Sequence, residues 1–72
     1  MDWHYNEATN EYTVIRGACH ATVWHTVSGT WAALITSPVR EEGRDQLPTL
    51  EAAQAWAVTQ LVALAAAGHC GT

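Results

Sequence analysis

Residues 49–68 read TLEAAQAWAVTQLVALAAAG and predict the one long helix of this chain. Thr49 is suited to the N-cap, because its hydroxyl can accept a hydrogen bond from a free backbone N–H. Glu51 lies in the first turn, where the helix dipole favours negative charge. Gly68 can end the helix in the left-handed conformation. We therefore predict a helix over residues 50–67.

One stripe of this helix is expected to pack on a sheet, and it consists of Leu50, Ala53, Ala57, Leu61 and Leu64. The rest is unusual, because no Asp, Glu, Lys or Arg follows Glu51. The helix positions that we predict to contact a partner are Trp56, Thr59, Val62, Ala63 and Ala66. Trp56 matters most, since a Trp side chain buries about 150–250 Å². Three alternatives are open for the Trp56 side chain: it completes the monomer core, it belongs to a self-association surface, or it contacts a different protein.

Residues 11–16, 19–27 and 31–36 are rich in β-formers and are separated by the turn signals Gly17-Ala18 and Ser28-Gly29-Thr30. Residues 1–10 are expected to be an extra strand or an arm, residues 37–48 a charged loop, and residues 68–72 a short tail. The chain is thus predicted to be one α+β domain over residues 1–72. About three antiparallel strands would be packed by one C-terminal helix.

One helix leaves the other face of such a sheet open. We expect that face to carry His20, Thr22, Trp24 and Thr26 beside Ala32 and Leu34, or the opposite set if the register shifts by one residue. Neither set contains a charge. Something is therefore expected to cover part of this face, either residues 1–5 or a second copy of the protein.

The net charge is −4 over 72 residues, with three Arg and no Lys. Such a surface repels phosphate, so nucleic-acid binding is disfavoured. No apolar run reaches the roughly 18 residues that span a bilayer, and we expect a cytoplasmic protein of a bacterial cell. Cys19 and Cys70 form no Cys-x-x-Cys pair. Two reduced thiols are expected, and one long-range disulfide is the alternative.

Residues for catalysis or metal binding do not fall into a recognised pattern. His20 and His25 are expected on opposite faces of a strand, and the His69-Cys70 pair has no zinc-site spacing. A nucleophilic pair of Cys19 with a His would need an oriented third group and a pocket, which one helix on a small sheet rarely forms. The sequence also contains no Gly-rich phosphate loop. We expect no metal, no cofactor, no small-molecule substrate and no enzymatic activity.

Two resemblances support the topology. The pattern Trp31-Ala32-Ala33-x-Ile35, a charged segment with Gly43, and Thr49-x-x-Ala52-Ala53-x-x-Trp56 resembles the three-strand-plus-helix layout of Apetala-type and phage-integrase arm DNA-binding domains. The same helix start after a Trp-x-Ala strand is similar to HicB-type antitoxins, which associate and hold a toxin. The DNA-binding families use Arg and Lys on their strands, whereas residues 17–39 here have no Arg or Lys.

Size, acidity and uncharged surface together predict a non-enzymatic module that binds another protein. The excess of Ala, Thr, Val and Gly over Lys, Phe and Ile is typical of GC-rich bacterial or phage genes. A phage or mobile-element accessory that inhibits or regulates a bacterial defence complex fits this composition. The alternatives are a sheet-type nucleic-acid-binding regulator and an antitoxin-like homodimer. Besides the helix positions, the predicted partner-binding residues are Trp24, Glu41, Glu42 and Asp45.

Overall fold

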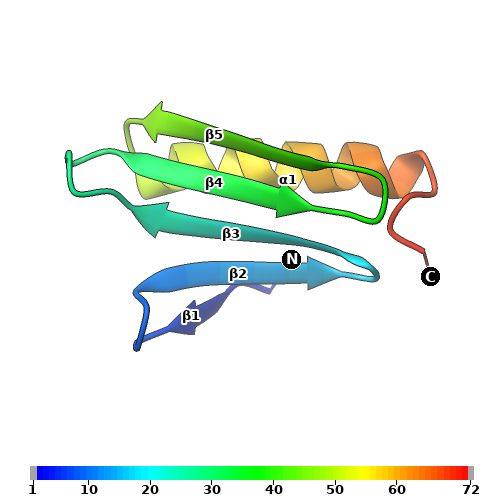
Figure 1. Ribbon diagram of the computed structural model, residues 1–72, viewed down its shortest axis with the longest axis horizontal. Helices are drawn as coiled ribbons and strands as arrows, with labels where there is room; N and C mark the ends of the chain where they lie inside the picture. The colour runs from blue at the N-terminus through cyan, green and yellow to red at the C-terminus, as the bar shows by residue number, and fades with distance from the viewer. Residues whose placement is uncertain (1, 72) are drawn as a thin grey trace.

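The computed structural model describes residues 2–71, and Met1 and Thr72 lie outside them. Five strands precede one helix: β1 (His4–Asn6), β2 (Glu11–Arg16), β3 (Cys19–His25), β4 (Trp31–Thr36), β5 (Glu41–Leu47) and α1 (Leu50–Ala66). The strands form one antiparallel sheet in chain order, and α1 crosses one of its faces, behind β4 and β5 in the view of Figure 1. The predicted α+β class, with one C-terminal helix on an antiparallel sheet, is confirmed.

The sheet has five strands, so the prediction of about three was wrong. We predicted that residues 1–10 form an extra strand or an arm. The first alternative holds, because β1 pairs with β2. β5 lies within residues 37–48, which we predicted to be a loop, and it pairs with β4 from Thr36↔Glu41 to Trp31↔Leu47. Its charged sequence has little β-propensity. An edge strand, however, needs a partner on one side only, and charged side chains are common there.

Two predicted boundaries also shift. β3 ends at His25 rather than at residue 27, because Thr26 belongs to the hairpin turn, where its N–H donates to the Thr30 carbonyl at 2.8 Å. α1 ends at Ala66, one residue early. The N-cap prediction is confirmed, since the Thr49 hydroxyl accepts a hydrogen bond from the Ala52 N–H at 3.0 Å.

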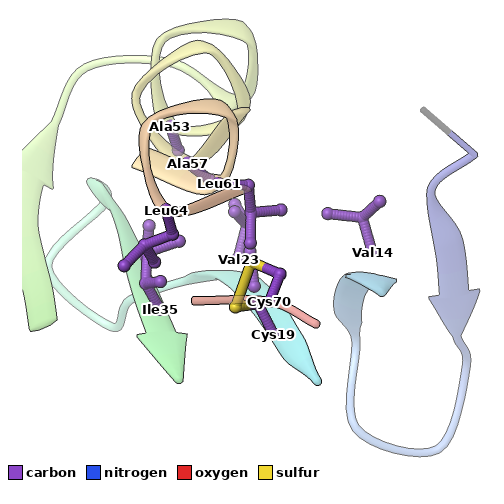
Figure 2. Close-up of a cluster of buried hydrophobic side chains, with 11 residues drawn as sticks. Val14, Cys19, Val23, Ile35, Ala53, Ala57, Leu61, Leu64 and Cys70 are labelled. Carbon is purple, nitrogen blue, oxygen red and sulfur yellow. A yellow bond between two sulfur atoms is a disulfide. The ribbon is translucent and has the colours of Figure 1, made fainter. Parts of the chain in front are cut away.

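The core lies between α1 and the sheet. Its buried side chains are Val14, Cys19, Ala21, Val23, Ala33 and Ile35 from the sheet, Ala53, Ala57, Leu61 and Leu64 from α1, and Cys70 (Figure 2). The predicted helix stripe is therefore confirmed, with Leu50 half-buried against it. The register across the sheet, Val14↔Ala21↔Ile35, places these residues on the same face.

Aromatic side chains complete the helix side of the sheet near β1 and β2. Tyr12 lies between Tyr5 and Trp31, with ring centroids 4.7 and 6.4 Å away, and His25 lies 4.8 Å from Trp31. Trp3 also packs against the core. These rings supply apolar area that an Ala-rich helix does not.

A disulfide joins Cys19, at the start of β3, to Cys70, beyond the end of α1, with the two Cα atoms 5.0 Å apart (Figure 2). The prediction of two reduced thiols was wrong. Its physical reason is the length of α1, which returns the chain to the β2–β3 hairpin, where the Ala18 N–H donates to the Cys70 carbonyl at 2.6 Å. Both cysteines are buried.

Gly17 is the residue that lets the tail approach this hairpin. Its φ is +58°, and a Cβ at this position would overlap the carbonyl oxygen of Cys70. We expect Gly17→Ala to lower the free energy of unfolding by about 2 kcal/mol, because it adds this overlap to the cost of a left-handed Ala. Chemical denaturation measures the change.

Gly29→Ala is the matched control, since Gly29 also has a positive φ, +89°, but open space around it. It should cost about 1 kcal/mol, the backbone contribution alone. Equal losses in the two variants would contradict the close packing of the tail on the hairpin.

Candidate protein-binding face

The sheet face opposite α1, which we call the open face, is not covered by any element of residues 2–71 (Figure 1). The strand registers arrange its side chains in rows. The central ones are Thr13, Ile15, His20, Thr22, Trp24, Ala32, Leu34 and Thr36. Of the two sets that the sequence allowed, this is the first, except for Thr26. We expected residues 1–5 or a second copy to cover this face. The described residues 2–5 do not, because β1 extends the sheet edge instead.

The centre of the open face is uncharged and partly apolar. Trp24 and Leu34 are half-buried among their neighbours, whereas Ile15 is 73% exposed. Sequence reasoning missed Ile15 as a site residue. The signal that could have found it is the alternation along β2, in which the buried Val14 and the exposed Ile15 necessarily take opposite faces.

Acidic residues border the open face. Glu11 is in register with Trp24, and Glu41 is in register with Thr36. Asp45 follows Arg44, the partner of Ala33, in the part of β5 that lies opposite Ala32. By the same alternation the arginines of the strands take the helix side, because Arg16 pairs with Cys19 and Arg44 pairs with Ala33. The strand residues on the open face thus combine an apolar centre with a negative border.

A β-bulge in β5 places Asp45 on this border. Arg44 is opposite Ala33 and Leu47 is opposite Trp31, so two residues, Asp45 and Gln46, stand where β4 has only Ala32. Gln46 takes a positive φ of 58° to do so. The extra residue returns Leu47 to the helix side, where it packs against the core. Without the bulge, alternation would put Asp45 and Leu47 on the same face.

Beside the bulge the open face is hollowed. The hollow has a volume of about 320 Å³ and is lined by Trp24, Ala32, Ala33, Gly43, Arg44 and Asp45. Its lining combines the small residues Ala32, Ala33 and Gly43 with the larger Trp24 and Asp45. We call this feature the Trp24 hollow.

The predicted partner-binding residues do not form one surface. Trp24, Glu41 and Asp45 belong to the open face. Glu42 pairs with Ile35, which places it on the helix side, and its carboxylate lies 3.4 Å from Nε of Arg40.

The remaining predicted residues are on α1. Trp56 is half-buried and packs against the core, which is the first of the three alternatives for it. The exposed part, which we call the helix back, consists of Thr59, Val62, Ala63 and Ala66. It lies on the far side of the molecule from the open face, and Val62 is its one large apolar side chain. A single compact partner therefore cannot contact both surfaces with full complementarity.

Residues 2–71 give little support for a metal site or a nucleophilic cysteine. No group of three or more His, Cys, Asp and Glu among them is placed to hold a metal ion. The Cys19 thiol is consumed in the disulfide. His20 and His25 take opposite faces, as predicted, because His20 pairs with Ile15 and His25 with Trp31. In this part of the chain no helix has the length and apolar character for crossing a bilayer.

Comparison of the chain with protein-family models, with curated proteins and with solved structures finds no match. The resemblances to the DNA-binding domains and to HicB-type antitoxins stay predictions.

Proposed function

We propose that this protein is a small non-enzymatic module that binds another protein through the open face of its sheet. The observation that supports this proposal is the uncovered, uncharged centre of the face, with Trp24, Leu34 and Ile15 inside an acidic border. Protein interfaces commonly have this anatomy, an apolar and aromatic centre depleted of charge within a polar rim. Ile15 is the large apolar side chain of this face that is mostly exposed, and Trp24 and Leu34 are partly accessible beside it.

The charges of the face favour a partner other than a second copy. Two open faces packed together would bring Glu11, Glu41 and Asp45 of one copy close to the same acids of the other, and like charges at close range oppose association. Phosphate would be repelled for the same reason, and the arginines of the strands lie on the helix side. A protein with an apolar patch and basic residues around it fits best.

A module of this kind acts by occupying a surface of its partner. A small accessory protein of a phage or mobile element can inhibit or regulate a larger bacterial complex in this way, and we retain that role as the proposal. The acidic border would speed the encounter with a basic groove and make it sensitive to salt.

Matched substitutions to Lys on the two sides of the molecule test the proposal. Ile15→Lys places a cation on the open face, and Val62→Lys places one on the helix back. Both side chains are largely exposed, at 73% and 49%, so the fold should tolerate both changes. We expect Ile15→Lys to weaken the affinity for a protein captured from a bacterial lysate by about 10-fold or more. Val62→Lys should change it by less than about 2-fold.

The binding constants are measured by calorimetry with the purified partner. A loss with Val62→Lys alone would move the interface to the helix back, and unchanged binding in both variants would reject the proposal. Low-salt gel shifts with DNA and RNA address the nucleic-acid alternative, which predicts a complex that weakens steeply with salt. Sedimentation at micromolar concentration tests the homodimer alternative, which predicts the mass of two chains.

A further inference from the structure

We propose that the Trp24 hollow receives an arginine side chain of the protein partner. This inference rests on the proposed function and adds the chemistry of the central contact. It starts from one row of side chains across the open face, in which Glu11 on β2 is in register with Trp24 on β3, and Trp24 with Ala32 on β4. Asp45 on β5 completes the row.

The row places Trp24 between two acidic residues, Glu11 on β2 and Asp45 on β5. A cation above the face of a Trp ring is attracted by the negative face of the π-system, and Trp is the strongest of the aromatic side chains in this respect. Asp45 lines the hollow and adds ionic attraction directly. Glu11 does not line it, but it is in register with Trp24 on the neighbouring strand and adds negative charge at longer range. A phosphate or a carboxylate in the same place would be repelled by both, so the hollow selects for positive charge.

The small lining residues leave room for the aliphatic part of such a side chain. Ala32 is buried, and Gly43 has no side chain. The backbone does not demand glycine at position 43, because its φ lies outside the left-handed region and an added Cβ would meet Ala33 O and Leu34 Cδ1 at 3.5 Å, an ordinary contact. The fold would accept Ala there, and the main effect of Gly43 is the space that it leaves.

The cations of this chain are directed elsewhere. Arg44 contributes to the lining, but its pairing with Ala33 directs its side chain to the helix side. Arg40 is engaged with Glu42 at 3.4 Å. Arg44 therefore lines the hollow from a strand position that faces the helix side, and Asp45 is the charged lining residue whose position faces the open side.

Arginine fits better than lysine. A planar guanidinium can stack on an indole and donate two parallel hydrogen bonds to a carboxylate, whereas an ammonium is a compact and strongly hydrated charge. The volume of about 320 Å³ is large enough for one arginine side chain.

The test uses three small probes with the full protein: the Nα-acetyl methylamides of arginine, of lysine and of citrulline, the neutral isostere of arginine. Binding is followed by ¹⁵N NMR at the Trp24 indole N–H and the Gly43 amide. We expect saturable shifts with the arginine probe at a dissociation constant of about 10 mM, as for one isolated side-chain contact. The lysine probe should bind more weakly, and the citrulline probe at least about 5-fold more weakly.

Two acidic residues of the same strand provide the matched variants. Asp45→Asn should weaken the arginine probe by about 5-fold, whereas Glu42→Gln, on the helix side, should leave it unchanged. Gly43→Val should abolish binding by filling the hollow. The ¹⁵N spectrum of each variant reports whether the fold is intact.

The inference is overturned if the citrulline probe binds as well as the arginine probe, if Glu42→Gln weakens binding as much as Asp45→Asn, or if no probe shifts the Trp24 indole signal. The proposed function has a separate readout, the affinity of Ile15→Lys for the partner. If that affinity falls while the probes do not bind, the interface stands and the arginine contact does not. If that affinity is unchanged, the proposed function and the partner arginine fail together.

Discussion

Reduction of the Cys19–Cys70 disulfide is expected to lower the free energy of unfolding by about 4 kcal/mol. The bond closes a loop with a sequence separation of 51 residues, and the chain-entropy relation gives about this value for such a loop. A domain of 72 residues has a total stability of roughly 4–11 kcal/mol, at about 0.05–0.15 kcal/mol per residue. Loss of one bond would therefore remove a large part of the stability.

Urea denaturation with and without dithiothreitol, followed by Trp fluorescence, measures this loss. The double variant Cys19→Ala/Cys70→Ala is the control, because reductant should not change its stability. A decrease of less than about 1 kcal/mol in the wild-type protein would contradict the expectation, as would an equal response of the double variant.

The disulfide also bears on the cytoplasmic location that we predict. Disulfides persist in oxidising compartments and are rare in a cytoplasm that keeps thiols reduced. The sequence thus predicts a reducing compartment, whereas the disulfide favours an oxidising one. Alkylation of thiols in intact cells before lysis, followed by mass spectrometry of the peptides with Cys19 and Cys70, decides between them.

The second large effect is expected from Leu61→Ala, which should cost about 3 kcal/mol. The buried stripe of α1 contains two Ala and two Leu, and Leu61 is 0% exposed. Ala57, one turn before Leu61 in the stripe, has no methylene group that could fill the cavity, so both the transfer free energy and the cavity contribute. At 4–8 °C per kcal/mol, the melting temperature should fall by roughly 12–24 °C.

Val62→Ala is the control, because it removes apolar atoms from the next residue of the same helix. Val62 is 49% exposed on the helix back, and its truncation should change stability by less than about 0.5 kcal/mol. Thermal denaturation by circular dichroism at two protein concentrations compares the variants. A large, concentration-dependent loss with Val62→Ala would show that another copy of the protein covers the helix back.

The helix and three of the strands could be predicted because their signals are local. Thr49, Gly17 and the alternation in β3 each specify a cap, a turn or a face within a few residues. β5 could not be predicted in this way, because Glu41 to Asp45 have little β-propensity and form a strand only by pairing with β4. The disulfide depends on where a helix of 17 residues returns the chain, which is not a property of the sequence around either cysteine.

The candidate site was predictable one residue at a time but not as a group. Trp24 and Asp45 were both predicted to contact a partner. Their position in one row with Glu11, however, depends on three strand pairings and on the bulge in β5. Gly43 was seen as part of a loop, and only the distances around its missing Cβ give it a role. The helix back, which we also predicted to contact a partner, lies on the opposite side of the molecule.

The meander order of the sheet has a consequence for how the thiols meet. Every strand pairs with its neighbour in sequence, so each hairpin closes only a short loop and can form quickly. Docking of α1 and the contact between Cys19 and Cys70 are the events that join distant parts of the chain. The completed fold then shields both sulfur atoms from solvent, with the cysteines 0% and 1% exposed. An oxidant therefore has its best access to Cys19 and Cys70 while the sheet is formed and the helix is still undocked.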